Sequence, residues 1–381
     1  MIFFFRRIAN IDWVLFLAVI PLLGVGLITM KGFSPETIEM IGGKGGDYYF
    51  TRQLIWIFTA FVVFFAFSFI DWRFLKRGGL LLTLLILSLA PLGFLLFFGA
   101  KTRGAASWFH FSSFSISPAD PIKLLLILIL AKYFSRRHIE IAHIKHILIS
   151  ATFAILPAGL VFFQPDFGSA IIIFAIWLGM VMVSGISKKH LLLVFLTAML
   201  IFSVGWFSVL KPYQKDRILT FLDPLRDPKG AGYNAVQSMI AVGSGEILGK
   251  GIGYGTQSRL EFLPEHQTDF IFAAFAEEWG LIGVLAIFIL WGIAMWRILK
   301  NALGGQSNFE RLFGIGLAIF LVSHAVIHIG MNVGLLPITG IPLPFMSYGG
   351  SNLLTVFGGL GILMGMRRYS ANISDNQPVV L

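Results

Sequence analysis

The sequence predicts an all-α polytopic membrane protein with ten transmembrane helices, and three observations support this prediction. Of the 381 residues, 57% are hydrophobic and 13% are charged, whereas a soluble domain is usually about 25% charged. The apolar residues form long runs, and a spanning helix needs about 20 mostly apolar residues. Basic residues cluster in the short segments between those runs, as is typical of side chains that contact lipid head groups.

The apolar runs define the expected helices in order along the chain. Two of them, 147–163 and 168–185, form one long apolar region that Gln164, Pro165 and Asp166 divide. Proline lacks a backbone donor and disfavours helix in the residue before it, so a tight turn is expected there. The complete set of predicted spans is 12–30, 52–70, 79–99, 119–135, 147–163, 168–185, 190–209, 271–297, 312–332 and 350–366.

The charge distribution predicts that both termini are cytoplasmic. With Arg6 and Arg7 placed inside, most basic residues of the short connections also fall on the inner side, which agrees with the positive-inside rule. The formal net charge of +10 therefore indicates a membrane surface and not a nucleic-acid partner. The chain contains no cysteine, which excludes disulfides and thiolate chemistry.

Residues 1–368 are predicted to form a single transmembrane domain, and residues 369–381 a short polar cytoplasmic tail. One large outer loop, 210–270, separates the seventh and eighth helices. Within it, residues 233–242 are apolar on one side at helical spacing, which is typical of a helix that lies at the membrane interface. A loop of this length is usually functional.

The segment before the eighth predicted helix contains the main candidate site residues. Glu265, His266 and Asp269 stand directly beside an apolar run, where ionisable groups are costly because desolvation disfavours the charged form. Such groups indicate a functional site. The alternative is a helix cap, in which Thr268 or Asp269 satisfies the first free amides of the helix.

Three more polar clusters fall on the same predicted outer side. They are Arg52, the pair Asp120 and Lys123, which lie three apart and share a helix face, and Asp166 in the predicted turn. Taken singly, each could be a side chain that reaches from the bilayer to its interface. The carboxylates of these clusters are suited to base catalysis or to binding a metal cation, and the basic side chains are suited to binding phosphate. Together they indicate a substrate with a lipid tail and a pyrophosphate.

Two further motifs favour simpler explanations. The glycine-rich segment 249–255 does not have the spacing of a phosphate-binding loop, and a flexible turn is expected. His324 and His328 are four apart on one predicted helix. No carboxylate accompanies them, so hydrogen bonds between helices are expected in place of a metal site.

Two segments carry a resemblance to a known family. Phe262–Glu278 reads FLPEHQTDFIFAAFAEE and Asn332–Asn352 reads NVGLLPITGIPLPFMSYGGSN. They resemble the SEDS family, the shape, elongation, division and sporulation proteins of bacteria. Residues 328–333 and 338–344 look more like the rod-shape (RodA) branch than the division (FtsW) branch. The resemblance implies a ten-helix peptidoglycan glycosyltransferase of the bacterial inner membrane, with its active site on the outer (periplasmic) face.

The implied reaction polymerises lipid II into β-1,4-linked glycan for cell elongation and rod shape, and releases undecaprenyl pyrophosphate. The implied partners are a class B penicillin-binding transpeptidase and other membrane proteins of the elongation complex. Small residues in the ninth helix, Gly314 and Gly316 among them, would allow close approach of the partner helix. The competing interpretations are a lipid II flippase and a non-catalytic scaffold that activates the transpeptidase.

The resemblance also implies roles for individual residues. Asp269 matches the essential aspartate of the family and would be the general base that accepts a proton from the acceptor hydroxyl, although the role of cation ligand stays open. Asp120 stands where the family usually has glutamate. A divalent cation, Mg²⁺ or Mn²⁺, is expected, with Asp166, Glu265 or Asp269 as ligands. The expected phosphate-binding residues are Arg52, Lys123, Arg217 and Arg259, and the expected supporting residues are Asp120, Asp166, Glu265 and His266.

Overall fold

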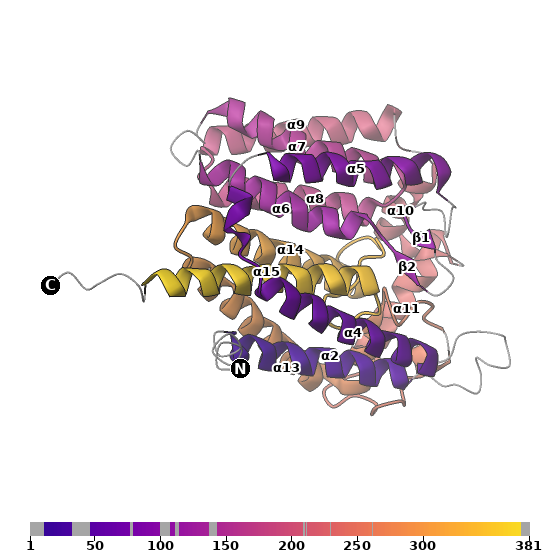
Figure 1. Cartoon of the computed structure of the whole chain (residues 1–381). Helices are drawn as coiled ribbons and strands as arrows, with labels where there is room; N and C mark the ends of the chain where they lie inside the picture. Colours follow the sequence, from indigo (N-terminus) through magenta and orange to yellow (C-terminus); the bar gives the residue numbers. More distant parts are fainter. Residues whose placement is uncertain are drawn as a thin grey trace.

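The computed structural model describes residues 11–32, 46–76, 79–99, 107–110, 114–136, 143–208, 210, 212–228, 230–260 and 262–374. Each of the ten predicted runs contains a helix (Figure 1). These helices are α2 (Trp13–Lys31), α4 (Gly46–Ser68), α5 (Leu80–Phe98), α6 (Ala119–Ser135), α7 (Ile144–Phe163), α8 (Phe167–Val183), α9 (Lys188–Ser208), α13 (Ile271–Leu303), α14 (Asn308–Asn332) and α15 (Gly350–Ser374).

Seven of the described helices, namely α2, α4, α5, α7, α9, α13 and α14, are long and apolar enough to cross a membrane. The apolar α8 is shorter. The chain is therefore an all-α polytopic membrane protein. α15 continues to Ser374, into the segment predicted as a polar tail, and residues 375–381 lie outside the described part of the chain.

The loop between α9 and α13 is largely helical. It contains α10 (Pro212–Leu222), η2 (Pro224–Arg226), α11 (Ala231–Ser244) and α12 (Thr256–Arg259). The predicted interfacial helix at 233–242 thus lies within α11. A short antiparallel pair, β1 (Phe109–His110) with β2 (Ser115–Ile116), lies at the same end of the bundle as α10 and α11, which we call the hairpin end (Figure 1). We call the opposite end, where α2 begins and α15 ends, the terminus end.

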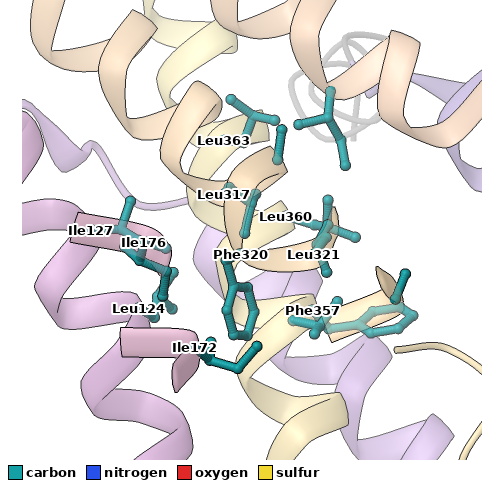
Figure 2. Close-up of a cluster of buried hydrophobic side chains, with 14 of the residues drawn as sticks. Leu124, Ile127, Ile172, Ile176, Leu317, Phe320, Leu321, Phe357, Leu360 and Leu363 are labelled. Carbon is teal, nitrogen blue, oxygen red and sulfur yellow. The ribbon is translucent and has the colours of Figure 1, made fainter. Parts of the chain in front are cut away.

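The centre of the bundle is an apolar core in which α6, α8, α14 and α15 meet (Figure 2). Ile127 of α6, Ile172 of α8 and Phe320 of α14 are all fully buried. Burial of such side chains stabilises the fold by about 1.5–3 kcal/mol each. The core closes the space between the two ends of the bundle, so polar groups at one end are separated from those at the other.

Small residues of α14 serve this internal packing. A side chain on Gly314 would collide with Ala302 of α13, and one on Gly316 would come within 2.6 Å of Ile127. The prediction that these glycines admit a partner helix is therefore wrong, because neighbouring helices of the same chain already occupy both positions.

α13 is not the single regular helix that the sequence predicts. It is interrupted at Gly280, whose φ of 61° and ψ of −167° are not helical. The 246–251 segment fills the interruption: Lys250 and Gly251 donate backbone hydrogen bonds to the carbonyls of Glu277 and Glu278. In return, the amides of Leu281 and Ile282 bind carbonyls of the same segment. The backbone groups released by the break are thus satisfied within the protein, as a non-aqueous environment requires.

Candidate functional site

The candidate site is organised around the 333–349 loop, which connects α14 to α15 at the hairpin end. Ser347 of this loop donates to the carbonyl of Thr268 at 2.7 Å, and the amide of Tyr348 donates to the carbonyl of Gln267 at 2.9 Å. Gln53 of α4 donates to the carbonyl of Ser347 at 3.2 Å. The two segments that carry the family resemblance are therefore bonded directly to each other and to the helix that carries Arg52.

Asp269 lies at the contact between these segments. The side-chain amide of Asn332 donates to the carbonyl of Asp269 at 3.0 Å and to that of His328 at 2.7 Å, while its oxygen accepts from the amide of Ala273 at 3.1 Å. Asn332 thus satisfies an amide in the first turn of α13 and fixes the backbone of Asp269. The carboxylate faces Gly340, because a Cβ built on Gly340 would lie 3.4 Å from Asp269 Oδ2.

Asp120 and Lys123 form the predicted ion pair. Lys123 Nζ lies 2.9 Å from Asp120 Oδ1, and the two residues are 2% and 7% exposed. The aspartate therefore reaches the lysine despite being shorter than the glutamate usual in the family.

Asp166 begins α8 and reaches the loop through its neighbours. Its carboxylate accepts from the amide of Ser169 at 3.0 Å, so it caps the helix. A Cβ on the adjacent Gly168 would lie 2.9 Å from the carbonyl of Thr339 and 2.6 Å from the side chain of Ile341. Residues 339–341 therefore contact the first turn of α8 and also the carboxylate of Asp269, which places Asp166 in the same neighbourhood.

Arg52 lies at the edge of this site among tyrosines. Its guanidinium lies 4.4 Å from the ring centre of Tyr48 and near the hydroxyl of Tyr348. Burial, together with the nearby Tyr48, raises the pKa of the Tyr348 hydroxyl although Arg52 acts in the opposite direction. Tyr348 therefore stays protonated and polar beside a permanent cation.

Of the other predicted site residues, His266 is buried, whereas Arg217 and Arg259 are exposed. His266 is buried, and its Nδ1 lies 2.8 Å from the carbonyl of Leu263, so this nitrogen carries the proton. Burial lowers the pKa of His266 despite that carbonyl and the charge of Glu265, which makes the ring neutral at pH 7. Arg217 on α10 and Arg259 on α12 are exposed, and within the described residues the side chain of neither forms an ion pair or hydrogen bond.

The sequence did not reveal a buried polar cluster on α13. Glu277 is fully buried and accepts from Lys250 at 2.7 Å, from Thr256 at 3.0 Å and from the amide of Gln257 at 3.1 Å. This carboxylate thereby anchors α12, which carries Arg259. The signal was present as two consecutive glutamates inside a predicted span, where ionisable residues are rare.

The two histidines of α14 also differ from their prediction. The Nδ1 atoms of His324 and His328 contact the carbonyls of Pro342 and Ile341. They therefore hold the 333–349 loop and do not connect helices to each other.

The expected metal ligands do not form a complete metal site. Within the described residues, no group of three or more His, Asp or Glu side chains is arranged to hold a cation. Asp166 already uses one oxygen for its helix cap. A cation at this site would need further oxygens from substrate phosphates and water, as is usual for Mg²⁺.

These features define a class of protein: a polytopic membrane protein with acids and cations gathered at one end of its helical bundle. The family model described as Cell cycle protein, which covers FtsW, RodA and SpoVE, matches residues 12–372. The chain belongs to this family.

Individual relatives agree with that membership. The chain is 37% identical to peptidoglycan glycosyltransferase MrdB of Escherichia coli K12 over 73% of this chain and 75% of the relative. It is 32% identical to stage V sporulation protein E of Bacillus subtilis, over 94% and 97% of the two chains. A probable FtsW of Thiomicrospira cyclica is 32% identical over 94% and 92%. The chain is thus comparably similar to MrdB, to the sporulation protein and to FtsW.

Solved structures show the same fold. A chain from a peptidoglycan synthase complex that coordinates polymerization and crosslinking superposes with a TM-score of 0.79 at 30% identity, covering 94% of this chain and 98% of that chain. Rod shape determining protein RodA of Thermus thermophilus gives a TM-score of 0.68 at 25% identity, covering 94% and 97%.

Gly340 offers a test of the loop geometry. Its φ of 70° lies in the left-handed region, where a residue with a side chain costs about 1–2 kcal/mol more. We expect Gly340→Ala to shift the loop away from Asp269, and to lower glycan synthesis more than it lowers the melting temperature. Gly349→Ala is the matched control, because a Cβ there would meet nothing within 4 Å. Equal activities of the two variants would contradict the proposed contact.

Proposed function

We propose that this protein is a peptidoglycan glycosyltransferase that polymerises lipid II into β-1,4-linked glycan and releases undecaprenyl pyrophosphate. The observation that carries the proposal is the half-buried carboxylate of Asp269, which faces the 333–349 loop, together with the buried Asp120–Lys123 pair in the first turn of α6 at the same end of the bundle. Family membership and the names of the relatives support it.

The proposed chemistry follows from the substrate. The donor sugar is joined to pyrophosphate in the α sense and the product linkage is β, so the displacement inverts the anomeric carbon. Asp269 accepts the proton of the acceptor 4-hydroxyl as that oxygen attacks, and the pyrophosphate leaves. Lys123 and Arg52 stabilise the charge that develops on the leaving group. Arg217 and Arg259, which are exposed on the loop, would contact the phosphates or the sugars as substrate enters.

The proposed orientation puts the hairpin end on the outer face of the inner membrane. Ten spans and two cytoplasmic termini follow if α6, α8 and α15 cross with the seven longer helices. A class B penicillin-binding transpeptidase is the proposed partner, since the similar structure comes from a complex that coordinates polymerization and crosslinking. Relatedness to MrdB and to RodA favours a role in elongation and rod shape, together with other elongation-complex proteins.

The apolar core argues against lipid II transport as the main activity. A flippase needs polar groups along a path from one end to the other, but Ile127, Ile172 and Phe320 close the centre of the bundle. A non-catalytic scaffold would not require the carboxylate of Asp269. The deciding experiment incubates purified protein with fluorescent lipid II, with and without the transpeptidase, and separates the products by electrophoresis. Ladders of glycan are expected; their absence under both conditions would contradict the proposal.

A divalent cation is part of the proposed reaction mixture. Because the described carboxylates do not form a complete site, we expect Mg²⁺ or Mn²⁺ to bind with the substrate pyrophosphate, with Asp269, Asp166 or Glu265 as protein ligands. EDTA is then expected to reduce glycan synthesis and added Mg²⁺ or Mn²⁺ to restore it, without a change in the melting temperature of the substrate-free protein. A lowered melting temperature in EDTA would instead indicate a structural cation.

A further inference from the structure

Asn332 is the last residue of α14 and is fully buried where α11, α13 and α14 meet. Its side-chain nitrogen donates to the carbonyls of Asp269 at 3.0 Å and His328 at 2.7 Å, and its oxygen accepts from the amide of Ala273 at 3.1 Å. Among side chains of this length, only the asparagine amide combines two donor protons with an acceptor oxygen. The three contacts therefore depend on the residue type and not on its size alone.

The bond to Ala273 caps α13 from a different helix. The residue at the N-cap position of α13 is Phe270, whose side chain forms no cap hydrogen bond. The first amides of a helix have no partner within that helix, and a buried one needs an acceptor from elsewhere. Asn332 supplies this acceptor to Ala273, which is fully buried, and also binds the carbonyl of Asp269, just before α13 begins. One amide group thus fixes both Asp269 and the first turn of α13.

Ser238 connects α11 of the large loop to Asn332. The carbonyl of Asn332 is among the last four of α14, which have no partner within their own helix. Ser238 is fully buried and donates to this carbonyl at 2.8 Å. The neighbouring Met239 packs against the turn that follows α14, because a Cβ on Gly334 would collide with its side chain. A shift of α11 would therefore move the end of α14, and Asn332 with it.

We propose that Asn332 is a positioning residue for Asp269, and that Ser238 makes this positioning depend on α11. The inference rests on the proposed function, in which Asp269 is the general base. A base must lie within hydrogen-bond reach of the proton that it accepts, and a misplacement of about 1 Å can cost about 10²-fold in rate. A displacement of α11 would thereby change the rate of glycan synthesis without any contact to Asp269.

The test measures kcat and KM for fluorescent lipid II with purified full-length variants, per folded molecule. Asn332→Leu keeps the approximate size of the side chain but removes its hydrogen bonds. We expect its kcat to fall about 10²-fold with little change in KM, because proton transfer and not substrate binding is affected. Ser238→Ala removes a single hydrogen bond and should lower kcat roughly two- to tenfold. This milder variant keeps the test available where Asn332→Leu folds poorly.

A double variant shows whether the two residues act through one chain of contacts. If Ser238 acts through Asn332, Ser238→Ala should lower kcat little further in the Asn332→Leu background, whereas independent effects would multiply. Ser150→Ala is the matched control for the loss of a buried hydroxyl. Ser150 of α7 is fully buried and accepts from the indole of Trp177 at 3.1 Å, so its loss should lower the melting temperature but not kcat.

Amide hydrogen exchange at Ala273 separates this inference from the proposed function. Exchange should be faster in Asn332→Leu, and to a smaller extent in Ser238→Ala, but unchanged in Ser150→Ala. Wild-type protein that makes no glycan would contradict the proposed function, and the exchange rates would still decide whether Asn332 and Ser238 hold the start of α13. A normal kcat in either variant, losses that multiply in the double variant, or unchanged exchange at Ala273 in Asn332→Leu would each overturn the inference.

Discussion

Asp269→Asn is expected to reduce glycan polymerisation by about 10²–10⁴-fold, the usual contribution of a general base. The amide has the size of the carboxylate but cannot accept the proton of the sugar hydroxyl. The backbone carbonyl of Asp269 still accepts from Asn332, so the loop contact should survive. The measurement is the rate of ladder formation from fluorescent lipid II by purified protein.

Asp216→Asn is the matched control for this variant. Asp216 is exposed on α10 in the same large loop, so the same change in charge should leave the rate unaltered. Well-folded Asp269→Asn protein that makes normal ladders would eliminate Asp269 as the base. A comparable loss in both variants would attribute the effect to the charge of the loop and not to proton transfer.

Lys123→Ala is expected to lower both stability and activity. Removal of one partner of a buried ion pair leaves the other charge uncompensated, at a cost of about 3–5 kcal/mol, and Asp120 and Lys123 are both buried. Because Lys123 is also proposed to bind the pyrophosphate, the rate of glycan synthesis per folded molecule should fall about 10–100-fold, as expected for a lost hydrogen bond to a charged group.

A second substitution separates these two effects. In Asp120→Ala combined with Lys123→Ala, no buried charge is left without its partner. Much of the stability lost in Lys123→Ala alone should therefore return, while the reaction stays slow. Arg297→Ala is the comparison at the terminus end, where Arg297 lies 2.7 Å from buried Asp12; it should lose stability but keep its rate per folded molecule. Full activity in Lys123→Ala would show that the lysine has no part in substrate binding.

The ion pair between Asp12 and Arg297 makes the stability of the folded protein depend on pH. Burial alone would raise the pKa of Asp12, but hydrogen bonds from Arg297, Asn301 and the amide of Leu15 outweigh it, so the pKa is lowered. A lowered carboxyl pKa contributes stability above the unfolded value of about 3.9. That contribution is present at pH 7 and disappears as the pH falls through the folded value.

Much of the helical architecture could be predicted from the sequence, because apolar runs of spanning length are a strong signal. The Asp120–Lys123 pair was predictable for a similar reason, since its two members share a helix face at close range. The turn at Pro165 followed from local backbone chemistry and is present between α7 and α8.

Contacts between distant segments could not be derived in this way. Nothing in the residues near Asn332 indicates that its side chain bonds Asp269 and Ala273, because these contacts depend on how α13 and α14 pack. The small residues of α14 illustrate the same limit. Gly314 and Gly316 signal close packing, but the sequence does not specify whether the neighbour is a partner or another helix of the same chain.

The interruption at Gly280 also constrains how the protein is made. The amides of Leu281 and Ile282 find acceptors only when Glu246 and Ile247 are in place, and these residues precede α13 in the chain. The part of α13 after Gly280 therefore acquires its full set of hydrogen-bond partners only after the 246–251 segment has folded against it. Folding is then sequential at this point, because the 246–251 segment must be in position before the hydrogen bonds at the break in α13 can form. Amide hydrogen exchange at Leu281 and Ile282 should accordingly rise and fall together with exchange at Lys250 and Gly251, as in one cooperative unit.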